Sequence, residues 1–465
     1  MKAEEKRADY TATTQHTGWQ RATLGELLPI KYGKSLPEKF RDITGRHPVF
    51  GSSGQVGMHS SALTTGPTLI IGRKGNVGAI HYSSEPCWPI DTVYYVEPDN
   101  GQNLRYYKYL LNSLNLVKLD KSTAVPGLSR DDYNAVKIVV APLNQQKRIV
   151  AEIEKQFSRL DEAVANLKRV KANLKRYKAA VLKAAVEGKL TEAWRKQHLP
   201  SPAGGRGAGG EGYEPASELL QRILAERRTK WEQAELAKMQ AKGKTPKDDT
   251  WKKKYPEPAA PDTTNLPELP KGWVWASVLQ VSEQIVDCPH STAKFVQDGR
   301  PCIDTTCIAP GRVLYEKLRF VSEETYLERI ARLKPQLGDI IFAREGTVGT
   351  AVVIPAGLAP CLGQRVMLMR VDRCTSPEFL AFALESAVVR AQYSNKILGS
   401  TVPHLNVADV KALGIPLPPL EEQQVIVAEV SRYLSIVAEA EAQVNANLQR
   451  AERLRQAVLQ SAFMS

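Results

Sequence analysis

Two long segments of the chain repeat apolar residues at alternating steps of three and four, which is the spacing of a coiled-coil seam. The first segment follows Pro142, and its apolar positions are Phe157, Leu160, Val164, Leu167, Val170, Leu174, Tyr177 and Val181. The second follows Pro419, and its apolar positions are Val430, Leu434, Val437, Val444, Leu448, Leu454 and Val458, with Glu441 and Asn447 as polar interruptions. The pattern predicts two helices of roughly 40 residues, each about 60 Å long at 1.5 Å per residue.

Two copies of one seam favour pairing of the helices with each other; the alternative is that each helix packs on its own domain. The periodicity does not fix the direction of the pairing. An antiparallel pair would place the segments that precede the helices at opposite ends of a rod, which is the geometry of a molecular ruler.

The segments before the helices, residues 18–141 and 272–418, have the short apolar runs and helical stretches of mixed α/β domains. The expected strands are residues 68–71, 92–96, 137–140, 340–342 and 366–369, and the expected helices are residues 103–114 and 377–394. Glycine-rich polar loops lie between strands: HPVFGSSGQVG from His47, GRKGNVG from Gly72 and FAREGTVG from Phe342. Because glycine lets the backbone approach a partner closely, we expect these loops to form contact surfaces.

The chain contains an internal repeat. GWQRATLGEL from Gly18 reappears as GWVWASVLQV from Gly272, at an offset of 272 − 18 = 254. The loop around Arg73 matches that around Arg344 at an offset of 271, and PLNQQKRIVAEIE matches PLEEQQVIVAEVS at 277, an offset that then stays constant. Each repeat thus begins with a domain of variable length and ends with a helix at constant spacing. This pattern predicts interchangeable recognition domains attached to a common helical scaffold.

These patterns divide the chain into six expected segments. They are a polar tail at 1–17, a first domain at 18–141, the first long helix and its end at 142–196, a linker with a basic helix at 197–271, a second domain at 272–418 and the second long helix at 419–465. In the linker, the lysines at 252–254 are either contacts to a nucleic-acid backbone or part of a solvated basic segment.

Charge narrows the class of partner. The 465 residues include 63 Lys and Arg against 50 Asp and Glu, a net charge of +13, which favours a polyanionic partner. A hydrophobic fraction of 43% excludes a wholly disordered or fibrous protein. The six Cys form no C-x-x-C pair, and no apolar run approaches the length that spans a bilayer. We therefore expect a reduced cytoplasmic protein without a membrane segment.

The motifs together resemble one family. LPELPKGWVW from Leu266, the PVFGSSG and IIGRKGNVG loops, STAVPGL before PLNQQKRIVAEIE, and EGKLTEAWRK from Glu187 are similar to the specificity subunit of Type I restriction-modification systems. The resemblance implies two target recognition domains that each read half of a bipartite DNA sequence, held apart by an antiparallel pair of long helices. It also implies double-stranded DNA, two methyltransferase subunits and two restriction and translocase subunits as partners. S-adenosylmethionine would then belong to the methyltransferase, and ATP and Mg to the restriction subunit.

No catalytic or metal-binding motif accompanies this resemblance. The sequence lacks an N-P-P-Y or D-P-P-Y segment, and Gly243-Lys244-Thr245 lacks the upstream glycine of a P-loop. The His residues are scattered without metal-ligand spacing. We therefore expect a non-catalytic chain without a cofactor of its own. The alternatives are a coiled-coil scaffold that binds nucleic acid without sequence preference and an enzyme with unrecognised motifs.

Candidate DNA contacts lie in the polar loops, because base edges are read by a few side chains and phosphates by Lys and Arg. Those in the first domain are Ser52, Ser53, Gln55, Arg73, Lys74 and Asn76 as base contacts and Lys34, Arg41 and Arg46 as phosphate contacts. Those in the second are His290, Ser291, Thr292, Lys294, Arg344, Thr347 and Gln364. Arg73 and Arg344 occupy the same place in both copies, and a structural role for them is the alternative. Leu182 and Leu459 are the candidate contacts to the methyltransferase.

Overall fold

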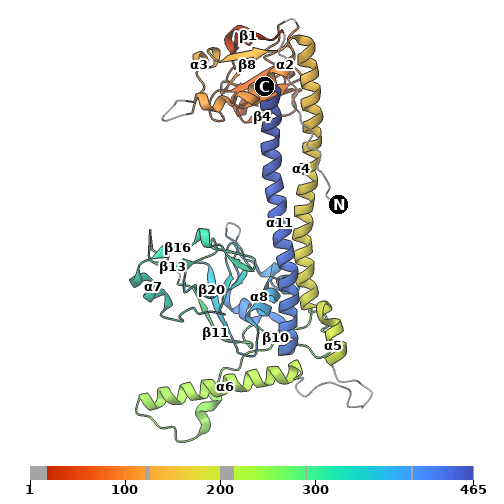
Figure 1. Ribbon diagram of the computed structural model, residues 1–465. Helices are drawn as coiled ribbons and strands as arrows, with labels where there is room; N and C mark the ends of the chain where they lie inside the picture. Colours follow the sequence, from red (N-terminus) through yellow and green to blue (C-terminus); the bar gives the residue numbers. More distant parts are fainter. Residues whose placement is uncertain are drawn as a thin grey trace. The chain divides into compact units, whose positions relative to one another are not determined.

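The computed structural model describes residues 18–99, 101–120, 126–198, 214–289, 291–399 and 402–463, and the expected tail at 1–17 lies outside them. The chain forms two compact units (Figure 1). Unit 1 comprises Met1–Val170 and Gln443–Ser465, and unit 2 comprises Lys171–Ala442. Two 44-residue helices, α4 (Leu143–Val186) and α11 (Leu420–Phe463), each begin in one unit and end in the other.

Unit 1 is a mixed α/β domain. Its strands are β1 (Gln20–Thr23), β2 (Lys31–Tyr32), β3 (His47–Gly51), β4 (Gly54–His59), β5 (Thr68–Gly72), β6 (Ile80–Ser83), β7 (Trp88–Pro89), β8 (Val93–Val96) and β9 (Lys137–Val140). Its short helices are α1 (Leu24–Leu27), α2 (Leu104–Leu114) and α3 (Arg130–Asn134). The sheets have the orders β2-β8-β5-β6, β4-β3-β7 and β1-β9. The expected strands and helix of this domain agree with β5, β8, β9 and α2 to within one residue at each end.

The core of unit 1 is closed by both long helices. Tyr106 of α2 contacts Phe463 of α11 with ring centroids 5.3 Å apart, and Phe157 of α4 contacts Tyr109 at 5.7 Å. Leu459 belongs to the same buried cluster and is only 4% exposed. The final turns of α11 are therefore part of the hydrophobic core of the first domain.

Unit 2 is a second mixed α/β domain with more strands. They are β10 (Val274–Ser277), β11 (Ser282–Asp287), β12 (Phe295–Val296), β13 (Arg300–Ile303), β14 (Ile308–Ala309), β15 (Arg312–Val313), β16 (Arg319–Val321), β17 (Ile340–Ala343), β18 (Ala351–Val353), β19 (Cys361–Leu362), β20 (Val366–Val371) and β21 (Gly414–Leu417). Four-stranded sheets have the orders β11-β20-β17-β18 and β12-β16-β13-β19, and β10 pairs with β21 as β1 pairs with β9. The six Cys of the whole chain are free and buried.

The helices of unit 2 depart from the expectation in one place. They are α5 (Glu192–His198), α6 (Ala216–Ala241), α7 (Glu323–Ile330), α8 (Pro377–Glu385), α9 (Ala387–Ala391) and α10 (Val407–Ala412). The single helix expected at 377–394 is wrong, because the chain breaks at Ser386, which is extended and accepts a hydrogen bond from the Val389 amide. Serine caps a new helix at this position and so separates α8 from α9.

The two long helices contact each other within each unit. In unit 1, Asp161 of α4 forms an ion pair with Arg455 of α11. In unit 2, the rings of Tyr177 and Tyr433 lie 6.3 Å apart. The expected seam is wrong at Leu454, which is 45% exposed, because Ala451, 8% exposed, takes the buried position one turn earlier. It is also wrong at Val170, which is 43% exposed.

Leu182 does not offer a free surface. It is 5% exposed and lies in the core of unit 2 with Val181, Ile426 and Phe342. Since Leu459 is equally enclosed in unit 1, the expectation that these two leucines contact a partner subunit is wrong: both fill the domain cores.

None of the helices in the described part of the chain is long and apolar enough to cross a membrane.

Candidate nucleic-acid interface

Two glycine-rich loops, one in each unit, share the same backbone hydrogen bonds. The loop between β5 and β6 is closed by Gly78 N–H donating to the Gly72 carbonyl at 2.8 Å. The loop between β17 and β18 is closed by Gly349 N–H donating to the Ala343 carbonyl at 2.9 Å. The offset is 271 in both cases, so the sequence repeat is also a repeat of local structure.

Glycine is needed at the end of each loop. Gly78 and Gly349 have φ values of 73° and 87°, in the left-handed region. A Cβ on Gly349 would lie 2.0 Å from the Tyr393 hydroxyl, and one on Gly78 would lie 2.7 Å from the Val117 amide nitrogen. Any side chain at these positions would displace the loop.

Each loop is also attached to a segment far ahead in the sequence. Leu128 N–H donates to the Arg73 carbonyl at 2.9 Å, and Leu405 N–H donates to the Arg344 carbonyl at 2.8 Å. In unit 1 the Tyr94 hydroxyl donates to the Leu128 carbonyl at 3.0 Å. Burial, aided by the neighbouring Tyr32, raises the pKa of Tyr94 to about 12, so its hydroxyl keeps the donated proton at neutral pH.

The two arginines that recur in these loops hold the loops in place. Arg344 is 7% exposed; its Nε and Nη2 donate to the carboxylate of Asp287, and its Nη1 pairs with Glu345 at 2.8 Å. Arg73 is half-buried, and its Nη2 donates to the Asp91 carbonyl at 2.5 Å. The expectation that Arg344 reads bases is therefore wrong, because its donors are engaged inside the domain. The structural alternative holds for this residue.

Two polar loops of the first domain that hold candidate residues contact each other. Asn76 N–H donates to Ser52 Oγ at 3.4 Å, which brings the two polar loops into contact. The candidates of the first domain whose side chains are exposed are Lys34, Arg46, Ser53, Gln55, Lys74 and Asn76. They keep their assignment as candidate DNA contacts.

Two other candidates of the first domain have internal roles. Ser52 is 9% exposed, and its carbonyl lies 3.0 Å from His81 Nε2. Arg41 donates to the carbonyls of Leu36 and Val56 at 3.2 and 3.0 Å. The expectation that Ser52 reads bases is wrong, because its side chain is buried and its Oγ accepts from the Asn76 amide. Arg41 fixes loop backbone, and its expected contact to phosphate stays a prediction.

The second domain places fewer of its candidates at the loop. Thr292, Lys294 and Thr347 are exposed, and Gln364 is half-buried; His290 lies outside the described residues. Arg329 links two of these regions, because it donates to the carbonyl and hydroxyl of Ser291 and to the Leu362 carbonyl at 2.8 Å. Ser291 thereby holds Arg329, which also binds the backbone at Leu362.

Basic and aromatic residues that the sequence analysis missed lie near these loops. Arg130 is exposed and lies over the ring of Tyr32, which is itself 53% exposed, at 5.9 Å. Arg365 is exposed with φ of 69°, and its carbonyl accepts from the Arg344 amide at 3.1 Å. Arg130 and Tyr32 could have been identified as candidates from their residue types, because basic and aromatic side chains are common together at nucleic-acid surfaces.

Among the described residues there is no group of three or more His, Cys, Asp or Glu that could hold a metal ion.

A family model, described as Type I restriction modification DNA specificity domain, matches residues 16–176 and 229–450. The chain belongs to this family. Members of the Type I specificity family recognise DNA and are not themselves catalytic.

Individual relatives agree with this membership. The chain is 22% identical to the Type I restriction enzyme EcoDI specificity subunit of Escherichia coli over 450 residues, covering 96% of this chain and 88% of that protein. It is 25% identical to the EcoBI specificity subunit of Escherichia coli over 402 residues, 85% of this chain and 72% of that one. A solved chain from work on the assembly and conformational transition of the type I R-M system is 17% identical, with a TM-score of 0.56 and coverage of 96% and 98%, and shares the fold.

Proposed function

We propose that each unit reads one half of a bipartite DNA target on behalf of a Type I restriction-modification complex. The observation that carries this proposal is the pair of loops with matching backbone hydrogen bonds, one in each domain. Each loop carries exposed polar side chains, Lys74 and Asn76 in one and Thr347 in the other. Two copies of one recognition device on one chain suit a target with two separate parts.

The long helices α4 and α11 are proposed to set the distance between the two half-sites as an antiparallel coiled coil. A helix of 44 residues is about 66 Å long at 1.5 Å per residue. Contacts of Asp161 with Arg455 and of Tyr177 with Tyr433 support an antiparallel pairing, because the partner number falls as the α4 number rises. For readers docked on one face of such a spacer, the proposed separation of the half-sites is about one helical turn of DNA.

The proposed protein partners are two methyltransferase and two restriction and translocase subunits. S-adenosylmethionine would be held by the methyltransferase, and ATP and Mg by the restriction subunit, in the cytoplasm where the DNA lies. The apolar residues that the long helices expose are better docking candidates than the buried Leu182 and Leu459. They are Leu143, Val170, Tyr177, Ile436 and Leu454, each between 43% and 54% exposed.

Methylome sequencing tests this proposal directly. DNA from cells that express this chain with its methyltransferase is compared with DNA from cells that lack only this chain. We expect a bipartite motif with methylated adenines that disappears when the chain is absent. Identical methylation in both strains, with an assembled complex, would rule out the proposed role in target selection.

A further inference from the structure

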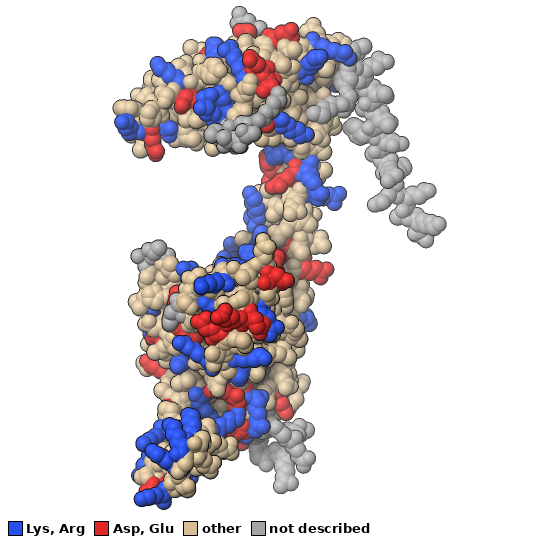
Figure 2. All heavy atoms as spheres, turned by 90° about the vertical axis from the view of Figure 1, so that its left-hand side faces the viewer, with Lys and Arg blue, Asp and Glu red and all other residues tan. Residues whose placement is uncertain are grey.

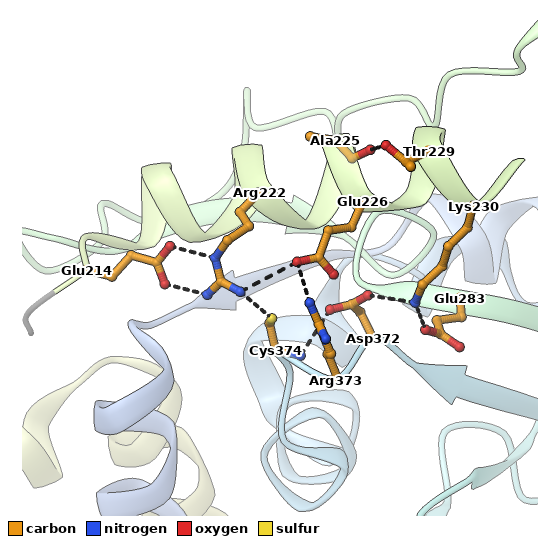
Figure 3. Close-up of polar contacts among 10 residues, drawn as sticks. All are labelled: Glu214, Arg222, Ala225, Glu226, Thr229, Lys230, Glu283, Asp372, Arg373 and Cys374. Carbon is orange, nitrogen blue, oxygen red and sulfur yellow. Dashed lines mark hydrogen bonds and ion pairs between the residues drawn. The ribbon is translucent and has the colours of Figure 1, made fainter. Parts of the chain in front are cut away.

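Residues 216–256 form a projection of unit 2, here named the basic arm, which consists of α6, the following turn and the 3-10 helix η4 (Asp249–Lys254). Its first part is fixed to the domain by polar contacts (Figure 3). Arg222 Nη1 donates to Cys374 Sγ at 2.8 Å, and Arg373 donates to Glu226 at 2.8 Å. The arm therefore has a defined attachment.

Apolar burial reinforces the attachment. Leu219 and Ile223 of α6 are 0% and 1% exposed and pack with Cys374 and Leu420. One turn further on, Arg227 donates to the carbonyls of Leu279 and Ser282, and Lys230 pairs with Glu283. α6 continues for eleven residues beyond Lys230, as far as Ala241.

The outer part of the arm supports itself. Trp231 of α6 stacks on Trp251 with centroids 6.1 Å apart and contacts Tyr255 at 5.4 Å, so the returning segment packs on the helix. Gly243, with φ of 67°, ends the helix, and Lys244 N–H donates to the Met239 carbonyl at 2.9 Å. This backbone pattern is typical of a well-formed helix end.

The arm carries an excess of positive charge. Residues 216–256 contain 11 Lys and Arg and 6 Asp and Glu, a net charge of 11 − 6 = +5. Four of the six acidic side chains form ion pairs with basic residues: Glu226 with Arg373, Glu232 with Arg228, Glu235 with Lys238 and Asp249 with Lys252. Asp248, at the outer end, accepts a hydrogen bond from the Thr250 amide. Five lysines at the outer end are exposed and form no ion pair with any residue that the structure describes; they are Lys242, Lys244, Lys247, Lys253 and Lys254. Figure 2 shows blue side chains gathered over this part of the chain, at the bottom of the view.

We propose that these five lysines bind the phosphate backbone of DNA that flanks the half-site read by unit 2. Lysine is a mobile point charge that neutralises phosphate without reading a base, so this contact adds affinity without sequence preference. The proposal rests on the proposed function, since it needs DNA already held by the neighbouring domain. In this proposal the arm is a second DNA contact of unit 2, one that does not depend on sequence.

The test compares two DNA duplexes bound to the complete complex with its methyltransferase. The short duplex ends at the outer base pair of the second half-site, and the long duplex extends about 10 base pairs further, roughly one helical turn. Fluorescence anisotropy gives affinities across a range of salt concentrations. In one variant the five lysines become glutamine; in the matched control they become arginine, which keeps the charge.

We expect the wild type to bind the long duplex at least tenfold more tightly than the short one, and the arginine variant to behave likewise. The glutamine variant should lose this advantage, and its salt dependence on the long duplex should fall by up to about 4.5 in the log–log slope, since each phosphate contact contributes about 0.9. Its affinity for the short duplex should equal that of the wild type.

Two results would overturn the proposal. Equal affinities of the glutamine variant and the wild type for the long duplex would remove the arm from DNA binding. Loss of the methyltransferase from the purified complex of the glutamine variant would instead make the arm a protein-docking surface. Failure of the proposed function gives a different result, because the wild type would then show no preference for its target sequence on either duplex.

Discussion

Arg344 donates two parallel hydrogen bonds to Asp287, from Nε to Oδ1 at 2.8 Å and from Nη2 to Oδ2 at 3.0 Å. Its counterpart in the other domain, Arg73, has a backbone carbonyl where Arg344 has a carboxylate, and its guanidinium lies over the rings of Tyr32 and Tyr94 at 5.5 and 5.8 Å from their centroids. The arginine at this shared position therefore fixes the loop in both domains, through a carboxylate in one and a backbone carbonyl in the other. Its exposed neighbours remain the candidate DNA contacts.

Replacement of Arg344 by alanine should destabilise unit 2. The side chains of Arg344 and Asp287 are only 9% and 14% exposed, and removal of one partner from a buried pair costs about 3 to 5 kcal/mol. Urea denaturation of the chain with each substitution measures this loss. Arg312→Ala, at an exposed arginine of β15, is the control and should change stability by less than about 0.5 kcal/mol. An equally small effect of Arg344→Ala would show that the pair does not hold the loop.

Reading should depend on Asn76 in the first half-site and on Thr347 in the second. Both side chains are exposed at matching loop positions, and a lost base-edge contact costs about 1 to 3 kcal/mol of discrimination. Methylation of a library of altered targets measures base preference at every position. Asn76→Ala should relax preference in the first half-site alone, and Thr347→Ala in the second alone. Unchanged preferences at all positions of a half-site would exclude the corresponding residue as a reader.

Replacement of Glu422 by alanine should weaken the attachment of the segment that follows α4. Glu422 is 0% exposed and accepts hydrogen bonds from Thr191 at 2.6 Å, Arg195 at 2.6 Å and Trp273 at 2.7 Å. Without it, the buried Arg195 loses its counter-charge, at a cost of about 3 to 5 kcal/mol. Thermal and urea unfolding measure the loss, and the exposed neighbour Glu421→Ala provides a matched control. Equal stability of the two variants would contradict the assignment.

The strands next to the glycine-rich loops could be predicted because β5, β8 and β17 are buried throughout and so read as continuous apolar runs. Both long helices could be predicted because their apolar residues recur at helical spacing. β5 and β8 match their expected ranges to within one residue at each end. A structural role for Arg344 could be named from the sequence as an alternative, but its partner could not, because Asp287 is 57 residues away and no local pattern indicates that pairing. The same applies to Leu182 and Leu459: their period marks them as apolar, but only the packing of a domain against the helix end shows that they are enclosed.

The free energy of unfolding of unit 2 should depend on pH through Glu385, a buried residue of α8. Burial raises the pKa of this carboxyl above 4.5, although the Ala351 amide, Lys178 and Arg390 favour its ionised form. A raised carboxyl pKa means that the folded state penalises the ionised form. This penalty is fully present above the folded pKa and disappears as pH falls to the unfolded value.

Glu385→Gln should therefore be more stable than the wild type at neutral pH, with a difference that shrinks as pH falls through the folded pKa toward 4.5. Urea unfolding at a series of pH values gives this difference. Glu378→Gln, at an exposed glutamate of the same helix, should show no such trend. A difference that is constant with pH would show that Glu385 does not titrate in this range.

Insertion of whole heptads into both long helices should change the preferred gap between half-sites. Suitable positions are after Arg169 in α4 and after Val444 in α11, midway between the Asp161–Arg455 and Tyr177–Tyr433 contacts. Heptads preserve the seam, because they return apolar residues to the same face. Three heptads add about 31 Å at 1.5 Å per residue, which is close to one turn of DNA of about 34 Å. The preferred gap should therefore grow by about 9 or 10 base pairs, with both readers still facing the same side of the duplex.

A single heptad adds about 10 Å, or roughly three base pairs, and so turns one half-site about 100° around the DNA axis relative to the other. It should lengthen the gap with reduced affinity. Insertion into one helix alone breaks the pairing between α4 and α11 and should abolish methylation of every target. Methylome sequencing of the three variants reports the preferred gap directly. An unchanged gap in the three-heptad variant would show that the helices do not determine the spacing of the half-sites.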